Sequence, residues 1–113
     1  MTWLEQYRGK CTTAAEAVRS VTSGHRVYVG GGCAVPHALV DALCARADEM
    51  ADVEIVHLMT VGEARYAAPE MAGRFRCRAL FVGENVRDAV HEGRADYVPV
   101  HLHQVPRLFR DGT

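Results

Sequence analysis

A short apolar stretch runs straight into three glycines, a proline and a helical pattern in the segment RVYVGGGCAVPHALVDAL, residues 26–43. Val27 and Val29 alternate with other residues as the apolar positions of a strand do, and Pro36 suits the first turn of a helix. A strand that turns sharply into a helix is a building unit of sheets covered by helices. The segment therefore predicts an α/β protein with a glycine-rich turn at the carboxyl end of a strand.

The rest of the chain continues this alternation of strands and helices. Thr13 and Glu16 have the spacing of a capping box at the start of a first helix, and the continuous apolar run VEIVHLM is typical of a strand buried on both faces. The elements expected after residue 43 are strands at 53–59, 78–83 and 95–102, helices at 85–93 and 104–112, and an irregular connection over 60–75. Alternation of this kind predicts an open, mostly parallel sheet with helices on both faces.

Composition bounds the kind of protein. The 113 residues suggest one domain, and 49% hydrophobic with 24% charged residues is ordinary for a soluble globular chain. A net charge of −1 gives no bulk attraction to nucleic acid or to an anionic membrane. The N-terminus lacks the apolar core of a signal peptide, and no apolar run approaches the roughly 20 residues that span a bilayer. We therefore expect a cytoplasmic protein without nucleic-acid or membrane partners.

The glycine turn leaves two interpretations open. It lacks the Gly-Lys-Ser/Thr ending of a phosphate-binding P-loop, and Val35 stands where a dinucleotide fingerprint needs its third glycine. Glycines allow a ligand to approach the backbone, and a following helix N-terminus favours an anion. The same glycines could instead serve a tight turn that requires a positive φ and close packing.

Four histidines are candidate ligands or bases. His101 and His103 lie two residues apart and would share a face of a strand, but no third metal ligand is identifiable, so we expect no metal site. His57 lies in an apolar strand, which predicts a buried, hydrogen-bonded histidine. His37, next to Pro36, is the histidine expected to face the glycine turn.

The cysteines and one glutamate are candidate reactive groups. Cys33 lies inside the turn, where a helix N-terminus would favour the thiolate, but a small packing residue is the preferred interpretation because no base is assured nearby. The four cysteines form no CxxC pair and are expected to be reduced structural thiols; they are Cys11, Cys33, Cys44 and Cys77. Glu84 is expected to be a charge at the start of a helix.

Three blocks of the sequence carry a resemblance to a known family. SGHRVYVGGGCAVPHALVDAL, DVEIVHLMTVG and FRCRALFVGENVRDAVHEGRADYVPVHLHQVPRLFRDG together resemble the N-terminal region of the acetyl-CoA hydrolase/transferase family, with GRADYVPV followed by VPRLF as the most specific part. The resemblance covers about 3–112. His25 replaces the Asp of the usual Ser-Gly-Asp turn, which affects a surface position.

The resemblance implies an enzyme with two tandem α/β domains and an active site between them. Such enzymes transfer CoA from an acyl-CoA to a small carboxylate through a glutamyl-CoA thioester, and some act as acyl-CoA hydrolases. Family members are several times longer, and their catalytic glutamate belongs to the C-terminal domain. No residue of this chain inherits that role, and no bound cofactor is expected beyond the coenzyme A thioester itself as substrate.

The resulting expectation is that residues 1–113 form a partial N-terminal CoA-transferase-like domain that is inactive alone. A stand-alone α/β binding or assembly module without catalysis is the alternative, and a different enzyme that uses Cys33 is a third. By resemblance, the turn faces the domain cleft and shapes the substrate pocket with Gly30, Gly31, Gly32, Cys33, Pro36 and His37. An incomplete sheet would leave an edge or an apolar face uncovered, which predicts self-association or a partner chain.

Overall fold

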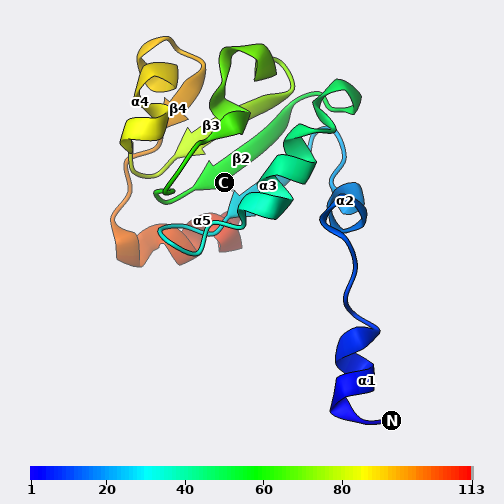
Figure 1. Ribbon diagram of the computed structural model, residues 1–113. Helices are drawn as coiled ribbons and strands as arrows, with labels where there is room; N and C mark the ends of the chain where they lie inside the picture. The colour runs from blue at the N-terminus through cyan, green and yellow to red at the C-terminus, as the bar shows by residue number, and fades with distance from the viewer. Residues whose placement is uncertain (113) are drawn as a thin grey trace.

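A computed structural model describes residues 1–112 and contains a parallel sheet that carries helices on both of its faces (Figure 1). Within these residues the sheet has four strands in the order β1-β2-β3-β4, all paired in parallel. The strands are β1 (Arg26–Val29), β2 (Val53–His57), β3 (Phe75–Ala79) and β4 (Ala95–Tyr97). The predicted open α/β sheet is therefore confirmed.

Two of the helices connect strands: α3 (His37–Cys44) lies between β1 and β2, and α4 (Glu84–His91) lies between β3 and β4. Helices α1 (Trp3–Arg8) and α2 (Ala14–Ala17) precede β1, and α5 (Val105–Asp111) follows β4. Short 3₁₀ turns fill the remaining connections, and two of them, Arg65–Ala67 and Pro69–Met71, form the link between β2 and β3. Glu84 is the first residue of α4, as expected for a charge at a helix start.

The N-terminal part differs from the prediction in two respects. Thr13 caps α2 by accepting a hydrogen bond from the Glu16 N–H, but the Glu16 carboxylate pairs with Arg19 and does not complete a capping box. A complete box occurs instead at Thr2 and Glu5, where it starts α1, a helix that the apolar pattern did not predict. Helix α1 buries none of its residues and extends away from the sheet (Figure 1).

The two later strands also differ from their predicted bounds. Strand β3 begins at Phe75 and ends at Ala79, so the predicted strand at 78–83 was placed too late. The apolar run hid an alternating pattern, because Phe75, Cys77 and Ala79 are buried while the arginines between them point to the other face. Strand β4 has three residues, and the chain leaves the sheet before Pro99, because proline cannot donate a ladder hydrogen bond.

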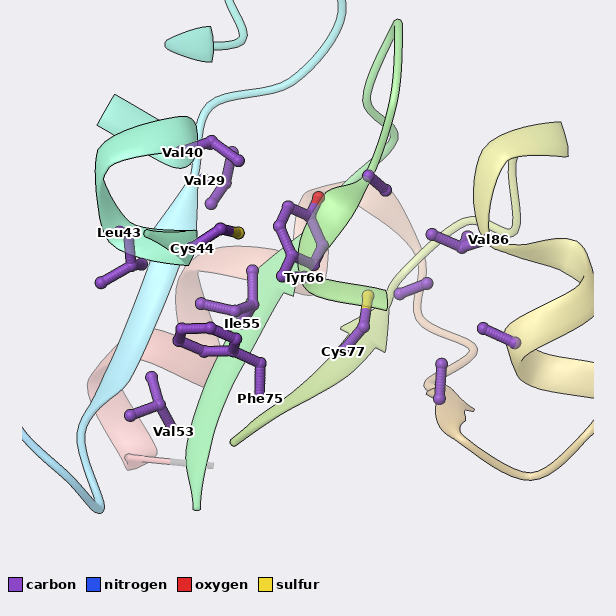
Figure 2. Packing of buried hydrophobic residues seen from close by; sticks show 14 of the residues in the cluster. Val29, Val40, Leu43, Cys44, Val53, Ile55, Tyr66, Phe75, Cys77 and Val86 are labelled. Carbon is purple, nitrogen blue, oxygen red and sulfur yellow. The ribbon is translucent and has the colours of Figure 1, made fainter. Parts of the chain in front are cut away.

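One face of the sheet carries the hydrophobic core. Val29 of β1, Ile55 of β2 and Cys77 of β3 pack here with residues of α3 and with Tyr66 (Figure 2). At roughly 25 cal/mol per Å² of apolar surface, burial of each large side chain stabilises the fold by about 1.5–3 kcal/mol. This face fixes the positions of β1, β2 and β3, and hence of the loops at their carboxyl ends.

The opposite face is polar at one end and is covered by α5. Glu54 of β2 pairs with Arg26 at 2.5 Å and with Arg78 at 3.6 Å, and Arg76 pairs with Asp96 at 2.6 Å. The hydrogen bonds from Arg76 hold the pKa of the Asp96 carboxyl below its usual value. The residues of β2 that point to this opposite face are only half-buried, whereas those on the core face are buried. This corrects the expectation that β2 is buried on both faces.

A buried polar group lies within the core. His57 has no exposed surface, and its Nδ1 lies 2.7 Å from the hydroxyl of Tyr66. The Tyr66 side chain lies among the apolar residues of the core (Figure 2). The Cys77 sulfur lies 4.0 Å from both ring nitrogens. Burial lowers the pKa of His57 to about 4 and raises the pKa of Tyr66 to about 12. The prediction of a buried, hydrogen-bonded histidine is confirmed.

The lowered pKa of His57 predicts a loss of stability in mild acid. An unfolded histidine titrates near 6.5, so between about pH 6.5 and about 4 the unfolded state binds more protons and the free energy of unfolding falls as pH falls. The shift corresponds to about 3 kcal/mol in total. Urea unfolding of the chain and of its His57→Gln variant over this pH range measures the difference. Equal slopes in the two proteins would contradict the assignment.

Candidate substrate-binding edge of the sheet

Three loops meet at the carboxyl edge of the sheet. They follow β1, β2 and β3, and they span residues 30–36, 58–62 and 80–83. Parallel strands bring their carboxyl ends to the same edge, where ligands of open α/β sheets usually bind. The glycine turn of the sequence is the first of these loops.

The glycine turn packs directly on the backbone at the end of β2. The Gly32 N–H donates to the Met59 carbonyl at 2.8 Å, and Gly32 forms an isolated parallel bridge with Thr60. Gly32 has a φ of +58°, and a Cβ on Gly31 would lie 2.8 Å from the Met59 carbonyl oxygen. Two of the three glycines are therefore explained by backbone conformation and close approach, which supports the tight-turn interpretation for this part of the turn.

Pro36 and His37 join the turn to the next loop. The Pro36 carbonyl accepts hydrogen bonds from the Leu39 and Val40 N–H groups, both at 3.0 Å, so Pro36 is the residue that precedes α3. The His37 ring lies against Gly62, where an added Cβ would be 2.8 Å from Cε1. The structure thus places His37 against the loop after β2, next to the glycine turn.

Asn85, a residue that no sequence pattern predicted to matter, fixes that second loop from the opposite side. Its Nδ2 donates to the Thr60 carbonyl at 3.3 Å, the Thr60 hydroxyl at 3.0 Å and the Gly62 carbonyl at 2.8 Å. The Oδ1 of Asn85 is buried without a hydrogen-bond partner among the described residues. The signal in the sequence is an asparagine in the first turn of a helix that follows a strand end, which is too common to identify a role.

The surface of this edge is mostly apolar. Met59, Val61 and Phe81 are each about half exposed on the loops after β2 and β3. Cys33 is exposed and free. Glycine backbone, apolar side chains and one imidazole can contact an uncharged or apolar part of a ligand, but the turn itself brings no carboxylate and base together.

Other predicted groups do not join this edge. His101 and His103 lie beyond β4, outside any strand, with their rings stacked at a centroid distance of 5.8 Å. The expectation that they share a face of a strand was wrong, because the chain leaves the sheet after Tyr97. Within residues 1–112 no group of three His, Cys, Asp or Glu side chains is placed to hold a metal ion.

The fold is that of an open, parallel α/β sheet, and its carboxyl edge is the place where ligands of such sheets usually bind. The sequence of the chain matches the acetyl-CoA hydrolase/transferase N-terminal domain over residues 1–113. The chain therefore belongs to the acetyl-CoA hydrolase/transferase family, as the resemblance in its sequence predicted.

Individual relatives agree with this assignment. The chain is 40% identical over 111 residues to a 4-hydroxybutyrate coenzyme A transferase of Clostridium kluyveri, covering 98% of this chain and 26% of that protein. It is 34% identical to a succinyl-CoA:cyclohexane-1-carboxylate CoA transferase of Geobacter metallireducens, covering 95% of this chain and 24% of the relative. The chain thus spans about a quarter of the length of these relatives.

Solved structures show the same fold. RipA from Yersinia pestis superposes with a TM-score of 0.83 at 30% identity, covering 96% of this chain and 28% of that one. The 4-hydroxybutyrate CoA-transferase abfT-2 from Porphyromonas gingivalis superposes with a TM-score of 0.69 at 27% identity, covering 98% and 24%. Among residues 1–112, no helix has the length and apolar character needed to cross a bilayer.

The close approach of the glycine turn to β2 predicts the effect of one methyl group. Gly31→Ala places a Cβ against a backbone oxygen that cannot rotate away, so the turn must shift and weaken the Gly32–Met59 hydrogen bond. We expect a loss of about 1–3 kcal/mol in the free energy of unfolding. Gly9→Ala is the matched control, since its Cβ would meet ordinary contacts at 3.5 Å. Equal stabilities of the two variants in urea unfolding would contradict this account.

Proposed function

We propose that this chain is the N-terminal segment of a CoA-transferase or acyl-CoA hydrolase that moves CoA between an acyl-CoA and a small carboxylate. The observation that carries the proposal is the family match over the whole chain, together with the glycine turn at the carboxyl edge of the sheet. The relatives from several organisms are named as CoA transferases that act on carboxylates, which supports the same substrate class.

In this proposal the turn contributes a wall of the pocket for the acyl group or the carboxylate. The wall consists of Gly30, Gly31, Gly32, Cys33, Pro36 and His37, with His37 closing the space beside Gly62. The mostly apolar surface around it suits the uncharged part of a substrate rather than a bare anion. The coenzyme A thioester is a substrate here, and the proposal requires no bound cofactor.

The nucleophile is proposed to come from outside this chain. The resemblance places the catalytic glutamate in a C-terminal domain, and the chain spans about a quarter of its relatives. A segment that forms one wall of a two-domain site lacks both the attacking carboxylate and the opposite wall. We therefore propose that residues 1–113 have no CoA-transferase activity alone.

Association and compartment form part of the same proposal. Large apolar side chains are exposed on α1 and α5, among them Trp3, Tyr7 and Phe109, and exposed apolar surface favours contact with another chain. In isolation we expect self-association or a need for a partner chain. The cysteines among the described residues form no disulfide, which supports a cytoplasmic location, where thiols are kept reduced.

A stand-alone binding or assembly module is the second candidate. The hydrophobic core on one face of the sheet favours it, because such a core can hold the strands together. The two candidates differ in whether the segment supports CoA transfer when the rest of an enzyme is present.

Exchange of the N-terminal region tests the proposal. Residues 1–112 of this chain replace the matched region of the Clostridium kluyveri transferase, and CoA transfer from acetyl-CoA to 4-hydroxybutyrate is followed. We expect the hybrid to turn over within about tenfold of the parent, a barrier difference of about 1.4 kcal/mol, and the isolated chain to show no turnover.

Two results would contradict the proposal. A folded hybrid without activity would favour the stand-alone module. Turnover by the isolated chain that disappears when one of its own carboxylates is changed would place the nucleophile inside these residues.

A further inference from the structure

The loop that follows β2 is held from the core as well as from its neighbours at the edge of the sheet. This β2 loop, residues 58–65, carries Met59 and Val61, which are exposed apolar residues of the edge. His57 is the last residue of β2, and Tyr66 lies in the 3₁₀ turn after the loop. The hydrogen bond between His57 Nδ1 and the Tyr66 hydroxyl therefore closes the loop at its base, between residues nine positions apart.

Thr60 connects this closure to α4. It is buried, and its hydroxyl accepts a hydrogen bond from Asn85 Nδ2 at 3.0 Å. The amide orientation of Asn85 is fixed, because the same Nδ2 also donates to the carbonyl oxygens of Thr60 and Gly62. Burial raises the pKa of Tyr66 to about 12, and a hydrogen bond from the Thr60 side chain lowers it against that rise. We call the side chains of Asn85, Thr60, Tyr66 and His57 the polar network.

The direction of donation along the polar network follows from its first member. An amide nitrogen can only donate, so the Thr60 hydroxyl accepts from Asn85 and directs its own hydrogen toward Tyr66. The Tyr66 hydroxyl then donates to Nδ1 of His57, which carries no proton. The proton of the neutral ring is on Nε2, 4.0 Å from the Cys77 sulfur. The network is thus satisfied from α4 to the core with a neutral His57.

Packing alone does not require these polar atoms. A phenylalanine in place of Tyr66 and a leucine in place of His57 would fill similar volumes in this apolar core (Figure 2). Replacement of both partners of a buried hydrogen bond by apolar groups is often nearly neutral for stability. Apolar contacts are non-directional, whereas a satisfied series of hydrogen bonds selects one arrangement of its members. The polar network therefore matters more for the conformation of the β2 loop than for the stability of the fold.

We propose that the polar network fixes the β2 loop in one conformation, so that Tyr66 and His57 are positioning residues for the wall of the substrate pocket. Both side chains are buried, so they act on the edge of the sheet through the loop that carries Met59 and Val61. The fixed conformation follows from the contacts of this chain, and only its effect on substrate binding rests on the proposed function.

Two backbone amides report on the conformation of the β2 loop. The Gly32 N–H donates to the Met59 carbonyl, and the Phe81 N–H donates to the carbonyl of the preceding loop residue, both at 2.8 Å. A change of the loop conformation breaks these two bonds and opens the amides to exchange with solvent. The Glu54 amide is the reference, because it donates to the His25 carbonyl at the opposite end of the sheet.

Amide hydrogen exchange and urea unfolding of three variants test the proposal. Tyr66→Phe removes the central hydroxyl, His57→Leu removes its acceptor, and the double variant removes both. Each single variant leaves a buried polar atom unpaired, so we expect its urea midpoint to fall by about 1 M and that of the double variant to stay within about 0.5 M of the parent. In all three, exchange at Gly32 and Phe81 relative to Glu54 is expected to be about tenfold faster or more.

The double variant separates positioning from stability, and Tyr97→Phe is the matched control. Tyr97 is about half exposed on β4, so loss of its hydroxyl is expected to change neither the midpoint nor the exchange rates. Two outcomes would overturn the proposal. One is an equal change of exchange at Gly32, Phe81 and Glu54 in the single variants. The other is a double variant that regains both its stability and slow exchange at Gly32 and Phe81.

Steady-state kinetics of the hybrid with the Clostridium kluyveri transferase test the effect on substrate. The double variant is expected to raise KM for acyl-CoA by about fivefold or more and to leave kcat within about twofold, because the loop contacts bound substrate and not the reacting atoms. An unchanged KM in an active hybrid would overturn the positioning role. If the hybrid without these substitutions is inactive, the proposed function fails, and hydrogen exchange still decides whether the polar network fixes the loop.

Discussion

The contact between the glycine turn and the end of β2 is the constraint on which the candidate site depends. Gly31 allows the turn to touch the Met59 carbonyl, and Gly32 donates its N–H to the same oxygen. Any side chain at Gly31 would separate the loops after β1 and β2. With the turn held there, α3 starts beside Gly62 and His37 packs on that glycine. Asn85 holds the same loop from α4, so three connections of the sheet are locked together at one edge.

The two faces of the sheet differ in how much they contribute to stability. The core face buries His57 with its Tyr66 partner and closes around Ile55. The opposite face carries exposed ion pairs, which are worth about 0–1 kcal/mol each, and a helix that leaves a cavity beneath it. The core face can therefore hold β1 and β2 in register, while the ion pairs of the opposite face add little to stability.

Much of the fold could be predicted from the sequence because the apolar periodicity is strong around β1, α3 and β2. The shift of β3 was missed because its alternating arginines broke the apolar run at Arg76 and Arg78, although each has an acidic partner across the sheet. The turn could be recognised from its glycines. The role of Asn85 could not be recognised. Its hydrogen bond reaches a loop 25 residues earlier in the chain, and such a contact leaves no local sequence pattern. The position of α5, which reverses the course of the chain, also depends on contacts between distant residues.

Protection of Cys33 tests most directly whether the glycine turn lines a substrate pocket. In the hybrid enzyme, iodoacetamide labelling of Cys33 is followed by peptide mass spectrometry, with exposed Cys11 as the internal reference. We expect saturating acyl-CoA to slow labelling at Cys33 on the order of tenfold, because a bound ligand buries most of its surface against the pocket wall, and to leave labelling at Cys11 unchanged. Labelling of Cys33 at the same rate with and without acyl-CoA would contradict the account.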